Sequence, residues 1–357
     1  MPLCIIMISA DMEDGMSGRS GCGGRITRRG FLQGAALAGA GLALCGPGRA
    51  LAAMAPAPEG VEAAVPTLLT RTPGKFSLLA VTDLHFYITQ IAAEPKTVED
   101  IRQMIAHFDP DLLVVTGDMW HNNPGGRGYS FCKWACKQFS HLPVPWAFAW
   151  GNHDMMDDYN KGHRLLTSAP NSMYAGAAAD GNYRIAVRDS ADSAPVWNLI
   201  FLNDSRGGIR GEQAQWFNAE AGRIRAAQPA PPPAFLFFHI PIPQYLDIAM
   251  PGKARGVMYE GVAHDDGDRA ALQAFHDSGM VRAMFCGHDH VNDYDGKLKG
   301  IHLEYIRATG REGYGGDRVP KGGTLISVDA AAGSFDSVTV FPDGSRWVPD
   351  KFEMKLG

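Results

Sequence analysis

Short apolar runs that each lead into a polar residue are the feature that most limits how this 357-residue chain folds. The run at 76–82 leads into Asp83, and the run at 112–116 leads into Gly117 and Asp118. The same pattern recurs at residues 145–150, 198–202, 235–238 and 281–285. Runs of this length, bounded by turn residues, are typical of buried strands. We therefore expect several strands that present polar side chains at their ends.

A helix is expected between the first two of these strands. Val98, Ile101, Ile105 and Phe108 recur at the spacing of one helix face. Strand, helix and strand in succession form a β-α-β unit, which places its two strands in parallel. Further strands are predicted at residues 301–306, 324–328 and 337–341. The fold class indicated is α/β, in one domain after residue 72.

In open α/β sheets, ligands bind beyond the carboxyl ends of the strands. The polar residues at these ends are therefore expected to converge on one site. They are Asp83, His85, Asp118, Asn152, His239, His288 and His290. Each such residue alone more often caps a turn, but seven placed in this way favour a shared function. Carboxylates, imidazoles and one amide, without a thiolate, suit divalent Mn, Fe or Zn.

The motifs stand in a specific order along the chain. They are D-x-H at 83–85, G-D at 117–118, G-N-H-D at 151–154, a lone histidine at 239 and G-H-x-H at 287–290. This order resembles the calcineurin-like metallophosphoesterase family, over roughly residues 75–330. The segments 237–245 and 287–305 are most similar to a purple-acid-phosphatase-like subgroup. The resemblance implies a four-layer α/β/β/α sandwich with a dinuclear metal site at the carboxyl ends of the strands.

The resemblance also implies how two divalent metal ions are held. The implied ligands are Asp83, His85 and His290 for one ion, Asn152, His239 and His288 for the other, and Asp118 as the bridge between both. A hydroxide that bridges the ions would attack phosphorus in line, because two metals lower the pKa of water toward roughly 7. His153 is expected to donate a proton to the leaving group, with Asp154 orienting its ring.

One departure from the purple acid phosphatase pattern defines a subtype. True purple acid phosphatases have a tyrosine three residues after the bridging aspartate, where this chain has His121. We therefore expect no tyrosinate–iron charge-transfer band. Weaker candidates for contacts to substrate or ligands are His121, Asn122, Arg127, Tyr245, Asp289, Asn292, Asp293 and Arg307. The segments 155–195 and 245–270 are expected to be loops that shape the pocket.

Three functions are compatible with this pattern. The first is hydrolysis of a small, soluble phosphate monoester. The second is a phosphodiesterase of cyclic nucleotide or glycerophosphodiester type that uses the same site. The third is a non-catalytic binding protein, which the presence of all seven expected ligands disfavours. A net charge of -5 gives no electrostatic sign of nucleic-acid binding.

The N-terminal segment has the parts of an export signal. Arg28 and Arg29 precede a mild apolar stretch at 34–44 and small residues at 50–55, and this arrangement resembles a twin-arginine signal. The expected partner is thus the twin-arginine translocase, and the expected location is periplasmic or extracellular. No apolar run in the body approaches the roughly 18 residues of a membrane span, so no transmembrane anchor is expected in the mature form. The residues before Met16 include acidic side chains, which are unusual in the basic region of a signal, so we expect translation to start at Met16.

The predicted organisation has four parts. They are a signal peptide at 1–52, an Ala/Pro-rich linker at 53–72, the phosphoesterase domain at 73–345 and a C-terminal tail at 346–357. Beyond the signal, Cys132, Cys136 and Cys286 fit neither a disulfide framework nor a zinc motif. They are expected to be small buried residues.

Overall fold

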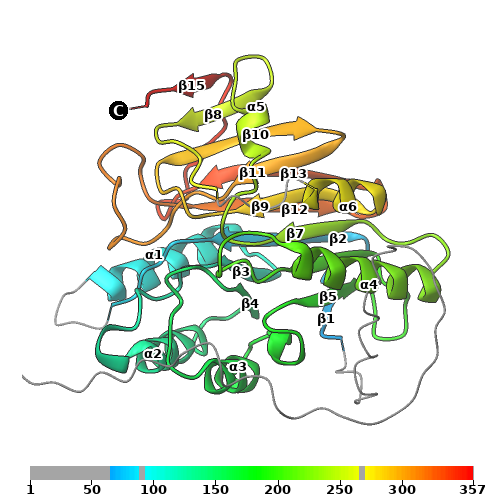
Figure 1. Ribbon diagram of the computed structural model, residues 1–357, viewed down its shortest axis with the longest axis horizontal. Coiled ribbons are helices and arrows are strands. Elements are labelled where there is room, and N and C mark those ends of the chain that lie inside the picture. The colour runs from blue at the N-terminus through cyan, green and yellow to red at the C-terminus, as the bar shows by residue number, and fades with distance from the viewer. Residues whose placement is uncertain (1–64, 88–92, 265–269, 357) are drawn as a thin grey trace, which may run out of the picture. The chain divides into compact units, whose positions relative to one another are not determined.

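Two β-sheets form the centre of the fold in the computed structural model, which describes residues 65–87, 93–264 and 270–356 (Figure 1). The six-stranded sheet has the order β14-β13-β12-β2-β3-β4. Its strands are β2 (Lys75–Val81), β3 (Leu112–Thr116), β4 (Trp146–Ala149), β12 (Gly323–Asp329), β13 (Ser334–Val340) and β14 (Arg346–Trp347). Strands β2, β3 and β4 are parallel neighbours, so their carboxyl ends lie at the same edge.

The second sheet has nine strands in the order β1-β5-β6-β7-β9-β11-β10-β8-β15. They are β1 (Thr67–Leu69), β5 (Tyr183–Arg188), β6 (Trp197–Phe201), β7 (Ala234–Phe237), β8 (Ala254–Met258), β9 (Val281–Cys286), β10 (Asn292–Leu298), β11 (Ile301–Tyr305) and β15 (Phe352–Met354). Strands β6, β7, β9 and β11 run parallel in this order. This sheet therefore also gathers several carboxyl ends at one edge.

Helices cover the outer faces of the two sheets. The helices are α1 (Ala93–Phe108), α2 (Gly128–Phe139), α3 (Tyr159–Ser168), α4 (Gly211–Ala227), α5 (Tyr245–Ile248) and α6 (Ala271–Asp277), with 3-10 turns η1 (Pro124–Gly126) and η2 (Gly176–Ala178). One apolar core joins α1, α2 and α3 to the six-stranded sheet and to the inner face of the other sheet. A second core joins α4, α5 and α6 to the outer face of the nine-stranded sheet. The layers are therefore α/β/β/α, as expected.

Alternation along single strands explains how one sheet serves both cores. In β6, Leu199 and Phe201 belong to the core between the sheets. Ile200, and Leu202 just after the strand, point into the core under α4. Successive side chains of a strand face opposite sides of the sheet, and here both sides are buried. This is why the strand appears in the sequence as a continuous apolar run.

The predicted strands are confirmed, and several elements were not foreseen. β3 has the predicted bounds, and β2, β4, β6, β7, β9, β11, β12 and β13 each overlap a predicted run. The segments 155–195 and 245–270, expected to be loops, contain α3 and β5 in the first and α5 and β8 in the second. β10 was missed because its sequence, NDYDGKL, is mostly polar.

Both ends of the described region extend past the predicted domain bounds. β1 lies in the predicted linker at 53–72 and pairs with β5. β14 and β15 lie in the predicted tail at 346–357 and pair with β13 and β8. These short edge strands carry little apolar periodicity, so only their pairing shows that they belong to the sheets. The predicted signal peptide lies outside the described residues, and among the described helices none is long and apolar enough to cross a membrane.

Candidate metal centre

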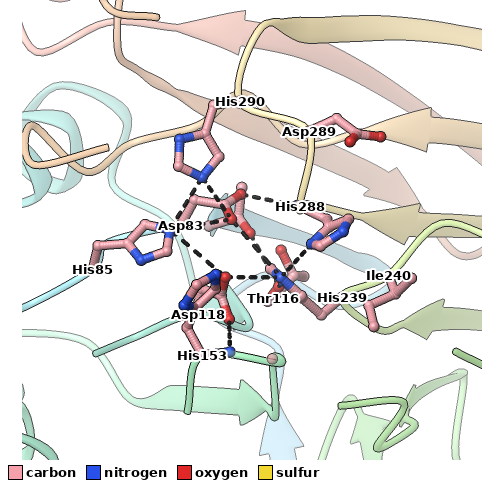
Figure 2. A network of polar contacts seen from close by, with 12 residues as sticks. Asp83, His85, Thr116, Asp118, His153, His239, Ile240, His288, Asp289 and His290 are labelled. Carbon is pink, nitrogen blue, oxygen red and sulfur yellow. Dashed lines mark hydrogen bonds and ion pairs between the residues drawn. The ribbon is translucent and has the colours of Figure 1, made fainter. Parts of the chain in front are cut away.

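The seven expected ligands leave the sheets at the same edge of the sandwich. Asp83 and His85 follow β2, Asp118 follows β3 and Asn152 follows β4, in the six-stranded sheet. His239 follows β7, and His288 and His290 follow β9, in the other sheet. Figure 2 shows the imidazole rings of His85, His239, His288 and His290 gathered around Asp83 and Asp118. The parallel strands of both sheets thus bring together residues that are far apart in sequence.

One group of ligand atoms comes from Asp83, His85 and His290, whose atoms all lie within 4.8 Å of one another. His290 Nε2 is 3.3 Å from Asp83 Oδ1 and 3.1 Å from His85 Nε2. The three side chains are at most 7% exposed. This group contains the three residues expected to hold one ion.

A second group comes from Asp118, His239 and His288, again within 4.8 Å. His239 Nε2 is 3.1 Å from Asp118 Oδ2 and 3.3 Å from His288 Nδ1. The two groups adjoin, since His85 Nε2 is 3.6 Å from Asp118 Oδ2. Asp118 therefore lies between them, which is the place of the expected bridge.

The two carboxylates are oriented by the backbone of neighbouring motifs. The His288 N–H donates to Asp83 Oδ2 at 3.0 Å, and the His153 N–H donates to Asp118 Oδ1 at 2.8 Å. The other oxygen of each carboxylate faces the imidazole nitrogens. His239 is fixed as well, because its Nδ1–H donates to the Thr116 carbonyl at 2.8 Å and leaves Nε2 toward Asp118. One atom of each of these side chains is held, and another is presented to the centre.

Buried atoms without partners test whether the donor set fits metal ions. Asp83 Oδ1 and Asn152 Oδ1 are buried and have no hydrogen-bond partner. Buried polar atoms are normally paired, and leaving one unpaired costs about 1–3 kcal/mol. Oxygen and imidazole donors of this kind suit borderline divalent ions. The residues therefore fit two divalent cations.

The backbone around the centre is unusual. Asp83, His85, Asp118 and His288 all have positive φ, between 48° and 81°. Non-glycine residues rarely adopt this conformation, and it clusters at functional sites. Gly287 is required by close approach, because a Cβ there would lie 2.0 Å from Thr82 Oγ1. The backbone at these strand ends is therefore strained, and the strain accompanies the close approach of the two sheets at this edge.

Burial and mutual charge set the protonation of these groups. Burial alone would raise the pKa of Asp83, but the imidazoles of His290, His239 and His85 more than offset it and hold this pKa well below the ordinary value. Burial lowers the pKa of His85 and of His288 to about 4. Those two imidazoles are therefore neutral at neutral pH, the form in which histidine binds metals.

His153 lies beside the centre, but Asp154 does not orient its ring. His153 Nδ1–H donates to Asn122 Oδ1 at 2.9 Å. Asp154 instead accepts from the Trp120 N–H at 3.0 Å and from the Gly151 N–H at 2.8 Å. The expectation for Asp154 is therefore wrong. At this turn the side chains of the adjacent residues His153 and Asp154 point in different directions, and Asn122 is the residue that orients the His153 ring. Burial, followed by the charge of Asp118, raises the pKa of Asp154 well above its usual value.

A cavity of about 550 Å³ opens onto the centre. Its lining includes His85, Asp118, His153, His288 and His290 from the strand ends. Another part of the lining, which we call the rim, comes from the segments 260–263 and 312–314. The expected segment 245–270 thus contributes lining residues, whereas residues 155–195 contribute none among the described residues.

The rim is tied to the metal centre by Tyr314. Its ring stacks on His290 with 4.1 Å between centroids. Its hydroxyl donates to Glu260 at 2.8 Å and accepts from the His290 N–H at 3.3 Å. Gly313 also lies against His290, since a Cβ there would be 2.7 Å from Nδ1. The sequence signal that was overlooked is the cluster of Gly310, Gly313, Gly315 and Gly316.

Most of the weaker candidates support the structure around the site. Tyr245 donates to the Met284 carbonyl within the core, and Arg307 pairs with Asp293. Asn292 accepts from the Tyr259 and Glu260 N–H groups, Asp289 accepts from the Ala263 N–H and Tyr305 hydroxyl, and Arg127 lies over Tyr87 and Phe131. Figure 2 shows the Asp289 carboxylate directed away from the ligand cluster. Asn292 and Asp289 thus hold the rim rather than the imidazoles.

Asp204 is a supporting residue that the sequence did not single out. It follows β6, is fully buried, and accepts from the His239 N–H at 3.1 Å and the Ile240 N–H at 2.8 Å. Burial raises its pKa to about 7, against the opposing effect of His239. Its position at the end of an apolar run, like Asp83 and Asp118, was the available signal.

An α/β/β/α sandwich with adjoining Asp/His clusters at its strand ends defines a class of metal-dependent hydrolases. The sequence profile of the calcineurin-like phosphoesterase family matches residues 76–292. The chain belongs to this family, which places it among hydrolases of phosphoric esters.

Curated relatives and solved structures agree with this assignment. Probable inactive purple acid phosphatase 29 of Arabidopsis thaliana is 27% identical, over 68% of this chain and 74% of its own length. Phosphatase DCR2 of Saccharomyces cerevisiae is 25% identical, over 62% of this chain and 45% of its own length. A dimetal phosphatase from Danio rerio has a TM-score of 0.53 at 13% identity, covering 78% of this chain and 99% of its own. Purple acid phosphatase PPD1 from yellow lupin has a TM-score of 0.51 at 13% identity, and the match covers 80% of this chain and 55% of the lupin protein. The solved structures support the fold.

Proposed function

We propose that this protein is a metal-dependent phosphatase that hydrolyses small phosphate monoesters. The observation that carries the proposal is the pair of adjoining groups, Asp83/His85/His290 and Asp118/His239/His288, with buried oxygens that lack partners. The names of its relatives, among them a phosphatase of yeast, support monoesters as the substrate class. Some plant relatives are named probable inactive. Here every expected ligand is present, which favours activity.

Each residue has a role in this proposal. Two divalent ions bound there would neutralise charge on the phosphoryl oxygens and lower the pKa of water. The residues proposed as ligands are Asp83, His85, Asp118, Asn152, His239, His288 and His290. His153 donates a proton to the leaving oxygen, and Asn122 holds its ring by accepting from Nδ1. Asp154 supports the G-N-H-D turn by accepting from the backbone of Gly151.

The test combines metal analysis with turnover. We expect elemental analysis to find two Mn, Fe or Zn ions per chain, and p-nitrophenyl phosphate to be hydrolysed faster than bis(p-nitrophenyl) phosphate. Chelation should abolish turnover, and added metal should restore it. Faster cleavage of the diester would replace the monoesterase by the phosphodiesterase alternative. Unchanged turnover with less than one ion per chain would contradict both.

The spectrum of the iron-loaded protein is a further part of the proposal. His121 stands where purple acid phosphatases have a tyrosine ligand, and its Nδ1 lies 3.2 Å from His85 Nδ1. We expect no strong visible band when iron is bound. A purple protein that bleaches on loss of iron would contradict this ligand set.

The proposal includes export through the twin-arginine route. It is supported by Arg28 and Arg29 ahead of the apolar stretch at 34–44. Since this route carries folded proteins, the metal ions can be bound before export. Replacing both arginines by lysine should retain the full-length precursor in the cytoplasm, and unchanged processing would contradict the route.

A further inference from the structure

The cavity beside the metal centre carries negative charge at its mouth. Glu260 and Glu312 line it, and Glu312 also lines an adjoining cavity of about 420 Å³ together with His85 and His121. Among the described residues, the exposed Glu312 carboxylate has no hydrogen bond or ion pair. Its charge is therefore available to whatever enters either cavity.

No lysine or arginine lines these two cavities in the described part of the chain. The basic residues nearby point their charged groups at other partners. Arg127 lies over the rings of Tyr87 and Phe131, and Arg311 pairs with Asp100 through two nitrogens. Lys321 donates to the carbonyl of the rim residue Tyr314 and partly offsets the charge of Glu260. Among the described residues, this leaves Glu312 as the carboxylate without a cation paired to it. Sites that bind several phosphate groups usually present arginine or lysine to them. This cavity offers carboxylates instead.

The floor and the mouth of the cavity thus favour groups of opposite charge. At the floor, the cavity reaches the metal centre at Asp118, and in that centre the fully buried Asp83 has an oxygen without a partner, which marks a place for cations and hence for one phosphoryl group. At the mouth, a second phosphate group would meet Glu312 and Glu260. A positive charge there would be attracted by both carboxylates and by the half-exposed ring of Tyr314.

We propose that the preferred substrate is the phosphate ester of an amino alcohol, with its ammonium group at the mouth of the cavity. Glu312 is the residue that selects this charge. The inference rests on the proposed function, because it assumes that the phosphoryl group binds at the metal centre. Substrates with further phosphate groups are disfavoured by the same carboxylates.

Turnover of matched esters tests the selection. With the metal-loaded protein, kcat/KM for choline phosphate and ethanolamine phosphate should exceed that for glycerol 3-phosphate by roughly 5-fold, as expected for about 1 kcal/mol between charges near 4 Å in water. Glu312→Gln should remove most of this ratio, and Glu312→Lys should invert it. Glu212→Gln, an exposed glutamate in the first turn of α4, is the matched control and should leave the ratio unchanged.

Binding without turnover gives an independent measurement. In calorimetry, 2-aminoethylphosphonate should bind the metal-loaded protein roughly 5-fold more tightly than propylphosphonate, and the difference should shrink in 1 M salt. Equal affinities and equal turnover, with p-nitrophenyl phosphate still hydrolysed, would overturn the charge selection alone. Failure to hydrolyse any ester with two ions bound would overturn the proposed function, while calorimetry would still decide the charge preference.

Discussion

The two walls of the cavity are built differently. The strand-end wall consists of His85, Asp118, His153, His288 and His290. The carboxylates of Asp118 and of the neighbouring Asp83 are buried and are oriented by backbone N–H groups. The rim, residues 260–263 and 312–314, consists of loop segments that are held mainly by Tyr314, Asp289 and Asn292. In the proposed function, the strand-end wall performs the chemistry and the rim selects the substrate. Changes in the first should therefore have larger effects than changes in the second.

The largest effect is expected at Asp118, where the two ligand groups meet. Asp118→Ala should release both ions together and lower turnover by about 10³-fold or more, since the ions contribute several kcal/mol to the transition state. Elemental analysis and turnover measure this. The exposed Asp192→Ala is the control. If the Asp118 variant kept two ions and normal turnover, the assignment of this wall would have to be abandoned.

The next effect concerns proton donation by His153. His153→Gln should slow hydrolysis of an alkyl phosphate by roughly 10²-fold or more and that of p-nitrophenyl phosphate far less, because only a poor leaving group needs the proton. Asn122→Gly should reproduce this difference, whereas Asn122→Asp keeps an acceptor for Nδ1 and should restore most of the activity. Asn171→Gly is a matched control, since both asparagines have φ of 60°. Equal losses on both esters would show that these residues act only structurally.

The third prediction compares buried carboxyls behind the two walls. Burial raises the pKa of Asp204 and of Asp289 to about 7. Because both values exceed the unfolded value near 4, the folded protein binds more protons between about pH 4 and 7, and its stability falls as pH rises through this window. In metal-free protein, Asp204→Asn and Asp289→Asn should each reduce this slope by up to about 1.4 kcal/mol per pH unit. Chemical denaturation at several pH values measures it.

Metal affinity should distinguish these two variants. Asp204 holds the backbone of His239, so Asp204→Asn should weaken metal binding. Asp289 holds the rim at Ala263, so Asp289→Asn should leave metal content unchanged. If Asp289→Asn lost metal and Asp204→Asn did not, the separate roles assigned to the strand-end wall and the rim would be contradicted.

The smallest effect is expected from Tyr314→Phe on the rim. The change keeps the ring on His290 but removes the hydroxyl that joins Glu260 to the His290 N–H. It should lower the free energy of unfolding by about 1 kcal/mol and leave metal content and kcat nearly unchanged. Thermal denaturation and metal analysis measure this. Loss of an ion would show that the Tyr314 hydroxyl supports the metal centre and not only the rim.

Much of the strand-end wall could be predicted from the sequence. Apolar runs buried on both faces identify strands such as β3, and the polar residues after them, such as Asp118, are at the sheet edge by geometry. The rim could not be predicted in this way. β10 carries few apolar residues, and it is placed by antiparallel pairing with β8, which local periodicity does not encode. Tyr314 lies in no strand, and its contacts with Glu260 and His290 depend on how the loops pack.

The sequence by itself determined the α/β class, the strands that carry the motifs and the residues available as metal ligands, because these follow from local patterns of burial and spacing. Only the tertiary structure decided that Asn122, and not Asp154, holds His153, that Asp204 supports His239, and that Glu260 and Glu312 face the cavity. Those contacts join segments far apart in the chain or depend on the direction of a side chain at a turn. Both are set by the packing of the two sheets and not by neighbouring residues.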